Sequence, residues 1–352
     1  MSHARATQVT GRTLSFVLNA TGRWRRLGRA RTNGSAVPST RRQRAALGAG
    51  VVLVLTFSAC TRPTPRASST RTAPPTATPP TTEGRGQATL PHDLRARELA
   101  FALEDGVYVG RADGTGIRRI TDIPGFEYQP DWSSDGTKLL LRVDDESGRS
   151  GGVWSVNADG SDPVDLTLRA GLVGGTPDWS PDATRIAFVG RAPGEDRVGI
   201  YVMHADGSAP DRLTSKRYEA QYPDWSPDGS KIAFTIVENL GFDIFVMNAD
   251  GSHVRRLTDT PGEDNWPEWS PDGTQMVYSY KNELWIMNAD GTGAHILAEE
   301  AGEPSWSHDG RWIAFDCAST AHQEGGMCAI HPDSTGRTPI LGGRGGFPAW
   351  RP

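Results

Sequence analysis

The stretch that decides the fold is Pro223-Asp224-Trp225-Ser226-Pro227-Asp228-Gly229, because close or looser copies of it recur along the chain. A repeat period near 40–45 residues, with short strand patterns inside each unit, is typical of a β-propeller. Six tryptophans mark the copies, at spacings of 47, 46, 44, 37 and 44 residues: Trp132, Trp179, Trp225, Trp269, Trp306 and Trp350.

A second phrase, Asn248-Ala249-Asp250-Gly251, repeats out of phase with the first. It predicts a tight turn, because Gly adopts positive φ and the Asp side chain accepts hydrogen bonds from nearby backbone N–H groups. Short apolar runs flank it, such as Lys231-Ile232-Ala233-Phe234-Thr235 and Ile244-Phe245-Val246-Met247. Each unit therefore predicts four antiparallel strands, which make one propeller blade.

The two ends of the repeat region predict how the ring closes. The region begins at Glu98-Leu99-Ala100-Phe101, which matches the second strand of a unit, and it ends at Phe347-Pro348-Ala349-Trp350, which matches the first. One blade is thus split between the two ends, and its pairing removes the free edges of an open ring. We expect residues 94–352 to form an all-β, six-bladed β-propeller of four-stranded antiparallel blades, closed by the C-terminal strand.

These repeats resemble the TolB-type propeller, a relative of WD-type repeats. The matching phrases are the Trp phrase, Lys-Ile-Ala-Phe, Ile-Phe-Val-Met-Asn-Ala-Asp-Gly and Arg-Arg-Leu-Thr, and together they cover about residues 95–352. The family carries a separate α/β domain before its propeller, which residues 61–93 are too few and too rich in Pro and Thr to form. The resemblance implies a periplasmic, partner-binding protein. The same repeat also occurs in peptidases and in an oligogalacturonate lyase, so it does not name an activity.

Residues 1–59 predict an export region. The first 60 residues contain ten Arg and no Asp, Glu or Lys. A basic segment, an apolar run from Ala45 to Phe57 and small residues before Cys60 predict a lipoprotein-type signal peptide at about 41–59. The apolar run is shorter than the roughly 20 residues that a membrane span needs. In this interpretation Cys60 is lipidated; the alternative is an ordinary signal peptide in which Cys60 is incidental.

Residues 60–93 predict a disordered tether, because they are rich in Pro and Thr and nearly free of large apolar side chains. Such a segment cannot bury enough surface to fold and favours extended polyproline II. We therefore expect a protein held by the lipid on Cys60 at the outer face of the cytoplasmic membrane or in the periplasm.

The charge balance limits the partners. Without the ten Arg that precede Cys60, 27 basic residues stand against 42 acidic ones. An acidic protein of this kind is not expected to bind nucleic acid through a basic face. It also lacks a polybasic membrane patch, so membrane attachment depends on the lipid.

Two further cysteines lie in one unit. Cys317 ends the predicted second strand and Cys328 lies in the third, so the two can face each other across a hairpin. In an exported protein this favours a disulfide, and the alternative is two free buried thiols. Neither has the Cys-x-x-Cys spacing of a metal site. The many aspartates invite a calcium hypothesis, but no stretch matches a calcium-binding loop.

Catalytic signals are weak. Gly148-Arg149-Ser150-Gly151-Gly152 fits the G-x-S-x-G pattern, which needs a strand–turn–helix elbow that this loop between two strands does not supply. The eight His are scattered and none pairs with another at metal-binding spacing. We expect no enzymatic activity, no cofactor and no metal.

The remaining prediction is binding at the mouth of the channel. The segments that enter each first strand repeat least and mix aromatic residues with carboxylates, which suits a basic or amine-bearing partner or a cation. We expect a monomeric envelope protein that binds a protein partner; the alternative is a propeller that binds or cleaves glycans. The expected partner-binding residues are Glu127, Tyr128, Gln129, Tyr218, Glu219, Tyr222, Asp264, Asn265, Trp266 and Glu303.

Overall fold

The computed structural model describes residues 90–145, 151–238, 241–317, 326–343 and 345–352. It also describes the backbone of two short paired strands, β1 (Phe16–Leu18) and β2 (Trp24–Arg26). The chain divides into two compact units, Met1–Pro79 and Pro80–Pro352. The expected signal peptide at 41–59, Cys60 and the tether at 60–89 lie outside the described residues. Within the described part of the chain, no helix is long and apolar enough to cross a membrane.

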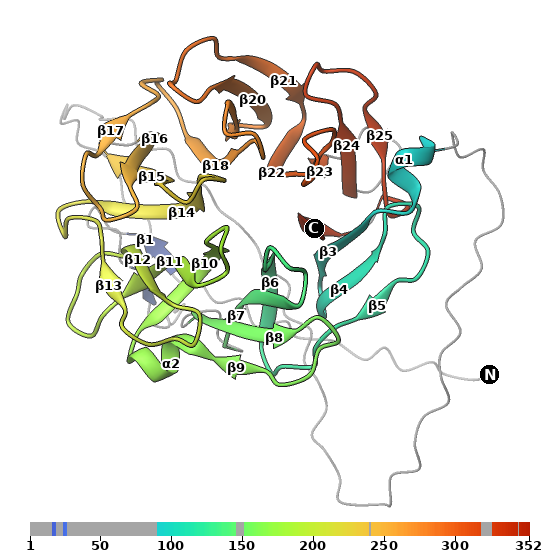
Figure 1. Cartoon of the computed structure of the whole chain (residues 1–352). Coiled ribbons are helices and arrows are strands. Elements are labelled where there is room, and N and C mark those ends of the chain that lie inside the picture. Colours follow the sequence, from blue (N-terminus) through green and yellow to red (C-terminus); the bar gives the residue numbers. More distant parts are fainter. Residues whose placement is uncertain are drawn as a thin grey trace, which may run out of the picture. The chain divides into compact units, whose positions relative to one another are not determined.

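The second unit contains six four-stranded antiparallel sheets arranged as blades around a ring, which confirms the predicted propeller (Figure 1). Each blade lists its strands from the channel outward. Blade 1 contains β26 (Gly346–Trp350), β3 (Glu98–Leu103), β4 (Gly106–Arg111) and β5 (Arg118–Arg119), and blade 2 contains β6 (Phe126–Trp132), β7 (Lys138–Asp144), β8 (Gly151–Asn157) and β9 (Val164–Asp165). Blade 3 contains β10 (Val173–Trp179), β11 (Arg185–Arg191), β12 (Gly199–His204) and β13 (Asp211–Arg212), and blade 4 contains β14 (Glu219–Trp225), β15 (Lys231–Glu238), β16 (Gly241–Asn248) and β17 (Arg255–Arg256). Blade 5 contains β18 (Asp264–Trp269), β19 (Gln275–Tyr280), β20 (Glu283–Asn288) and β21 (His295–Glu299), and blade 6 contains β22 (Ala301–Trp306), β23 (Ile313–Cys317), β24 (Gly326–Ile330) and β25 (Thr338–Pro339).

Two short helices accompany the blades. Helix α1 (His92–Arg95) precedes blade 1 and is fixed to blade 6, where the Trp312 indole N–H donates to Asp93 at 3.2 Å. Helix α2 (Leu166–Ala170) lies between blades 2 and 3. Asp165 caps α2 by accepting a hydrogen bond from the Leu168 N–H, and Gly171 ends it with a φ of 68°.

The turn after each innermost strand explains the Ser-x-Asp-Gly wording of the repeat. In blade 2 the Asp135 carboxylate accepts hydrogen bonds from the Ser133 hydroxyl and from the Thr137 N–H, at 2.7 and 2.9 Å. Gly136 then adopts a φ of 65°, which a residue with a Cβ adopts only at a cost. These aspartates therefore build turns, as the sequence predicts.

The ring closes through its split blade. Strand β26 pairs with β3, so the last residues of the chain supply the innermost strand of blade 1. The Trp350 indole N–H donates to the Ser305 carbonyl at 3.1 Å, and Arg351 forms an ion pair with Glu98 at 2.8 Å. The closure predicted from the phase of the repeat is confirmed.

The hydrophobic core lies between neighbouring blades. The repeated tryptophans supply much of it, and Trp179 and Trp225 are only 6% and 5% exposed. Trp179, for example, packs with Leu140 of blade 2 and with Phe188 of its own blade. Every blade thus needs both neighbours to complete its core, which makes the ring one cooperative unit.

Candidate functional site: the central channel and its mouth

Every innermost strand contains the same β-bulge. In blade 2 the pairing with β7 shifts between Tyr128 and Asp131, so Gln129 and Pro130 have no regular partner. Pro is tolerated there because it has no N–H to donate. The residue before the Pro takes a left-handed φ of 43–55° in all six blades: Gln129, Thr176, Tyr222, Trp266, Glu303 and Phe347.

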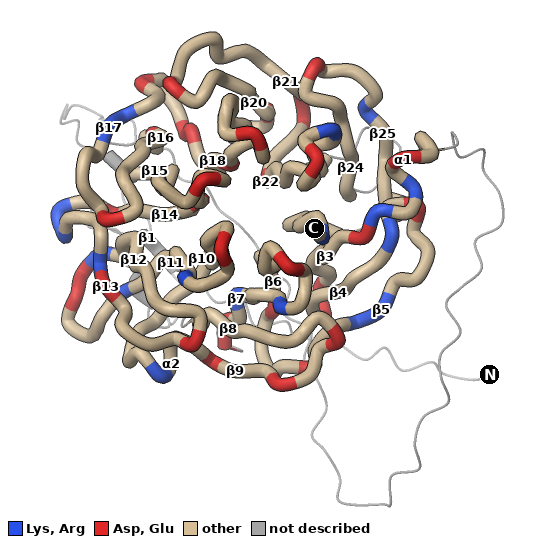
Figure 2. The backbone as a smooth tube through the Cα atoms, in the orientation of Figure 1, with Lys and Arg blue, Asp and Glu red and all other residues tan. Residues whose placement is uncertain are grey.

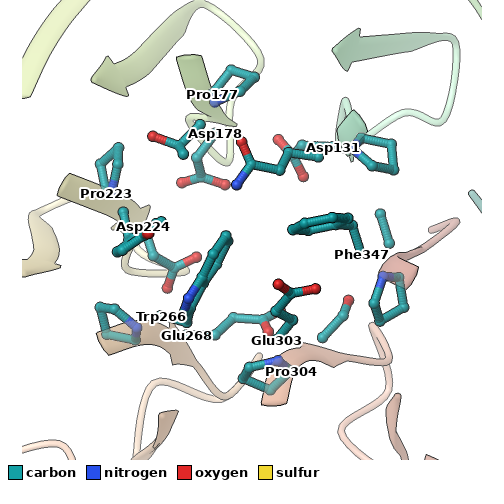
Figure 3. Close-up of a pocket in the computed structure, with 18 residues that line it drawn as sticks. Asp131, Pro177, Asp178, Pro223, Asp224, Trp266, Glu268, Glu303, Pro304 and Phe347 are labelled. Atoms are coloured by element: carbon teal, nitrogen blue, oxygen red, sulfur yellow. The ribbon is translucent and has the colours of Figure 1, made fainter. Parts of the chain in front are cut away.

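This backbone conformation is costly for residues other than Gly, and most of all for the β-branched Thr176. Its recurrence in six blades shows that the fold maintains it. The bulges turn three consecutive residues of every blade toward the ring centre, where they line a cavity of about 140 Å³ (Figure 3). We call these six triplets the channel lining: 129–131, 176–178, 222–224, 266–268, 303–305 and 347–349.

The third position of the triplet carries a carboxylate in four consecutive blades, which we call the acid tier: Asp131, Asp178, Asp224 and Glu268. Each of these carboxylates accepts a hydrogen bond from the backbone N–H of the Trp in the next blade, at 2.6–2.9 Å. The other two blades place Ser305 and Ala349 at this position. The acid tier is therefore a crescent, and it ties four pairs of blades together.

Burial raises the pKa values of the acid tier. Asp131 has a pKa of about 7, because desolvation outweighs the hydrogen bonds that it accepts from Trp179 and Trp132. Desolvation, followed by repulsion from Asp224 and Asp131, raises the pKa of Asp178 well above its usual range. The same two causes raise the pKa values of Asp224 and Glu268, with Glu268 the main neighbour of Asp224. By surface area these side chains are partly open to the channel, so water there reduces the effect.

Aromatic rings form one wall of the mouth. Tyr222 and Trp266 stack with ring centroids 3.9 Å apart, and Trp266 and Phe347 are 5.8 Å apart. Tyr128 continues this aromatic wall, because its ring lies 5.7 Å from Phe347. Arg142 lies 5.0 Å above the Tyr128 ring and forms an ion pair with Asp144.

A pair of carboxyl groups stands beside this wall. Burial, followed by repulsion from Asp316, raises the pKa of Glu303, and burial also raises the pKa of Asp316. The pair stays close because one proton bridges it. Asp316 also accepts a hydrogen bond from the Phe347 N–H at 3.2 Å, so the pair lies at the seam where β26 enters the ring. Figure 2 shows further acidic residues on the inner strands and on their turns around the opening.

The structure brings four of the expected partner-binding residues together in the channel lining: Gln129, Tyr222, Trp266 and Glu303. Tyr128 contacts them through Phe347. Tyr218 is 40% exposed just before β14, beside Glu219, whose carboxylate accepts a hydrogen bond from Gln221 at 3.2 Å. These two residues lie outside the channel lining.

Three expected residues have inward or lateral positions instead. Glu127 is 3% exposed, and its carboxylate accepts hydrogen bonds from the Ile123 N–H at 2.7 Å and from the Thr121 hydroxyl. Asp264 is fully buried and accepts a hydrogen bond from Thr260 at 2.7 Å. Asn265 pairs with Ser279 in the sheet of blade 5. The contacts of Glu127 and Asp264 hold the entry to their strands.

The sequence interpretation did not assign the acid tier to the site. It took the Asp of Pro-Asp-Trp as a turn and packing residue, and the hydrogen bonds to the next blade confirm the packing role. The missed signal is the dipeptide x-Pro before that Asp, which marks a bulge. Thr176 and Phe347 were missed for the same reason. Among the described residues, no group of three His, Cys, Asp or Glu could hold a metal ion.

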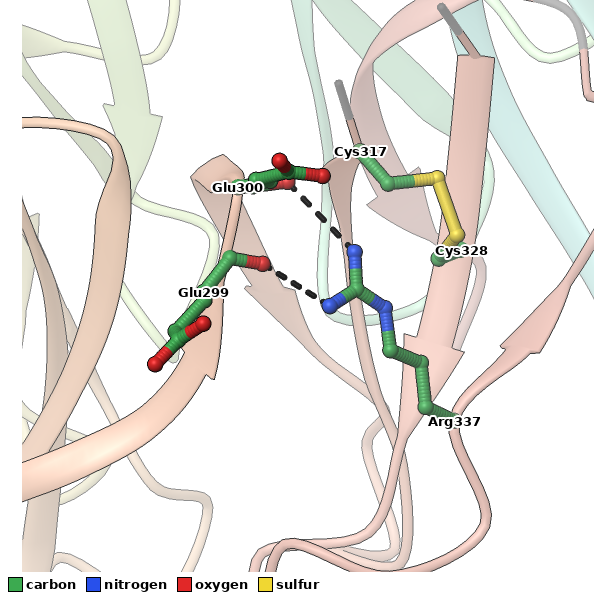
Figure 4. Close-up of a disulfide and its surroundings, with 5 residues drawn as sticks. All are labelled: Glu299, Glu300, Cys317, Cys328 and Arg337. Carbon is green, nitrogen blue, oxygen red and sulfur yellow. Dashed lines mark hydrogen bonds between the residues drawn. A yellow bond between two sulfur atoms is a disulfide. The ribbon is translucent and has the colours of Figure 1, made fainter. Parts of the chain in front are cut away.

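Cys317 and Cys328 are joined by a disulfide across the β23–β24 hairpin (Figure 4). Arg337 lies beside it and donates to the carbonyls of Glu299 and Glu300 at 2.8 and 3.5 Å. The disulfide and Arg337 together fix the outer part of blade 6 against blade 5. Because Asp316 directly precedes Cys317, the disulfide also fixes the strand that carries the carboxyl pair.

We expect the Cys317→Ala/Cys328→Ala variant to lose about 2–3 kcal/mol of unfolding free energy, because the disulfide closes a short loop in the unfolded chain. The measurement is urea denaturation of both proteins with and without a reductant. The reductant should lower the midpoint of the wild type to that of the variant and leave the variant unchanged. A wild-type midpoint insensitive to full reduction would contradict this stabilising role.

The fold and the channel define the class of protein: a six-bladed β-propeller with an acidic channel and an aromatic mouth. Residues 174–315 match the family model described as the TolB beta propeller domain. The chain is thus a TolB-like six-bladed propeller. No curated protein sequence matches it significantly.

Solved structures share this fold. TolB from Acinetobacter baumannii is 20% identical, with a TM-score of 0.62 over 75% of this chain and 69% of that one. A TolB-type protein from Agrobacterium tumefaciens is 22% identical, with a TM-score of 0.57 over 71% of this chain and 91% of that one. A chain of a nidogen/laminin complex is 13% identical, with a TM-score of 0.58 over 73% and 99%. At these identities the similarity concerns the fold.

Proposed function

We propose that the protein is a protein-binding module of the cell envelope, which captures its partner at the aromatic mouth of the channel. The proposal includes export, a lipid on Cys60 and a tether that holds the propeller away from the membrane. The observation that carries it is the aromatic wall, Tyr128, Tyr222, Trp266 and Phe347, beside an open cavity. Tyr and Trp dominate the energetics of protein interfaces because they bury large areas at a low cost in entropy.

Two features support this setting. The disulfide in blade 6 fits an oxidising, extracytoplasmic compartment. The TolB-like repeat is the one that the sequence shares with periplasmic propellers. The aromatic wall also favours a second candidate, a glycan-binding propeller, since sugars stack on aromatic rings. A cavity of about 140 Å³ holds a small group rather than a polysaccharide, so the protein partner is the first choice.

We expect the variant Tyr128→Ala/Tyr222→Ala/Trp266→Ala to lose partner capture. The triple substitution removes most of the aromatic wall, and interface aromatics of this kind contribute 2 kcal/mol or more each. The measurement is chemical crosslinking in intact cells, followed by purification of the propeller and mass spectrometry. One envelope protein recovered with the wild type and lost with the variant supports the proposal.

The matched control is Val254→Ala/Ile296→Ala, which removes two side chains that are 51% and 42% exposed on the outside of blades 4 and 5. This control should capture the partner normally. Circular dichroism must show that the triple variant keeps its β-structure. Equal capture by the wild type and by a folded triple variant would refute this site, and recovery of cell-wall fragments instead of protein would favour the glycan candidate.

A further inference from the structure

The channel lining holds oxygen atoms that nothing in the described structure satisfies. Gln129 Oε1, Thr176 Oγ1, Glu268 Oε2 and Glu303 Oε2 are buried and have no hydrogen-bond partner among the described residues. Thr176 is only 9% exposed, and its strained φ of 43° places it in the wall of the cavity. Buried polar groups without partners are costly and rare in native structures. All four atoms can accept a hydrogen bond, so they indicate an occupant rich in donors.

The acid tier gives this occupant a positive charge. Each of its carboxylates uses one oxygen for the Trp N–H of the next blade, as in Asp178 with Trp225 at 2.6 Å. The remaining oxygens face a cavity enclosed by protein, and a positive charge there would be attracted by several carboxylates at once. The acids stand on four consecutive blades, so the negative charge spreads along an arc.

The geometry also limits the size and shape of the occupant. No three acidic groups of the described residues are close enough to hold a metal ion, so a compact cation is not what the arc fits. The cavity of about 140 Å³ is close to one that accommodates benzene. The stacked pair of Tyr222 and Trp266 forms a flat surface beside it. A planar, donor-rich cation of side-chain size matches these features.

We propose that the channel receives a single arginine side chain, presented by an extended segment of the partner protein. The inference rests on the proposed function and names the chemistry of that partner. The guanidinium group is planar, carries five N–H donors and stacks on aromatic rings. It reaches the acid tier with its donors while one of its faces lies against the aromatic wall.

The test uses three blocked tripeptides, Gly-Xaa-Gly with an acetylated N-terminus and an amidated C-terminus, where Xaa is Arg, Lys or citrulline. Citrulline keeps the shape of arginine and lacks its charge. Binding to the full propeller is measured by calorimetry and by chemical-shift changes of the tryptophan indole N–H groups. We expect the Arg peptide to bind at least tenfold more tightly than the Lys peptide, and the citrulline peptide not to bind.

The variant Asp178→Asn/Glu268→Gln should weaken binding of the Arg peptide at least tenfold. Asp122→Asn is the control, because it removes one charge from a side chain that is 94% exposed and outside the channel. Equal binding of the Arg and citrulline peptides, or no binding of any peptide by the folded wild type, overturns the inference. So does calcium chloride that binds with unit stoichiometry and excludes the Arg peptide.

The two proposals fail in different ways. Partner capture that is unchanged in a folded Asp178→Asn/Glu268→Gln variant leaves the protein-binding function intact and overturns the arginine assignment. Arg-peptide binding without any captured protein upholds the assignment of the channel and refutes the protein-binding function. Loss of both in this variant, with both retained in Asp122→Asn, supports both proposals.

Discussion

Removal of residues 346–352 should abolish cooperative folding of the propeller. The deletion removes β26, which pairs with β3 and closes the ring. Trp350 is 7% exposed and packs in the core with Phe101 and Trp312, while Ala349 completes the neighbouring core. Loss of one such Trp side chain costs about 3–5 kcal/mol, which approaches the 5–15 kcal/mol stability of a whole domain. The measurement is thermal unfolding followed by circular dichroism, with gel filtration for aggregation.

A circular permutant provides the control for this deletion. Residues 346–352 are moved in front of residue 90 through a short Gly-Ser linker, so that blade 1 becomes continuous in sequence. This protein should recover a sharp unfolding transition, because the same contacts form without closure between chain ends. The single variant Trp350→Ala should unfold at a lower temperature but remain folded. A truncated protein with the unfolding midpoint of the wild type would show that closure is unimportant.

The second large effect concerns pH. An aspartate titrates near 3.8 in the unfolded chain, whereas Asp131 in the folded channel has a pKa of about 7. Between these pH values the folded state binds more protons than the unfolded state, so the free energy of unfolding falls as pH rises. Asp178 faces Asp224 and Asp131, and Asp224 faces Glu268 and Asp131, so their raised pKa values act in the same direction.

We therefore expect Asp178→Asn/Asp224→Asn to be more stable than the wild type at pH 8, by about 1–2 kcal/mol, since one pKa unit corresponds to 1.36 kcal/mol. The upper end of this range applies if little water enters the channel. The amide oxygen of Asn can still accept the hydrogen bonds of Trp225 and Trp269. Urea denaturation from pH 4 to 9 should show a steeper decline for the wild type. A variant less stable than the wild type at pH 8 would mean that the charged carboxylates stabilise the ring.

The sequence predicts the fold well because the fold is a repeat. The phase of the pattern at Glu98 and at Trp350 is enough to identify the split blade, since a strand without partners at either end must pair with the other. Turn chemistry at Asp135 and Gly136 is local and is therefore visible in the residues themselves. These features depend on neighbours in sequence or on a period, and both can be counted.

The site is harder to predict because it depends on a bulge. Side chains alternate between the two faces of a strand, and one extra residue reverses the alternation. Without the position of the bulge, Glu127 and Gln129 look equivalent, yet Glu127 bonds to the strand entry and Gln129 lines the channel. The raised pKa of Asp131 likewise arises from a ring that six distant segments complete. Such properties appear only when the blades are assembled.

The x-Pro bulge also has a consequence for how propellers of this type diversify. The residue before each Pro lies in the channel lining, while the Trp two positions after the Pro lies in the core between blades. One position can therefore mutate without disturbing the other, and each blade offers one such variable position. The channel is in effect a six-letter word written on a constant frame. New binding preferences can arise by single substitutions, and neighbours that touch, such as Tyr222 and Trp266, are expected to change together.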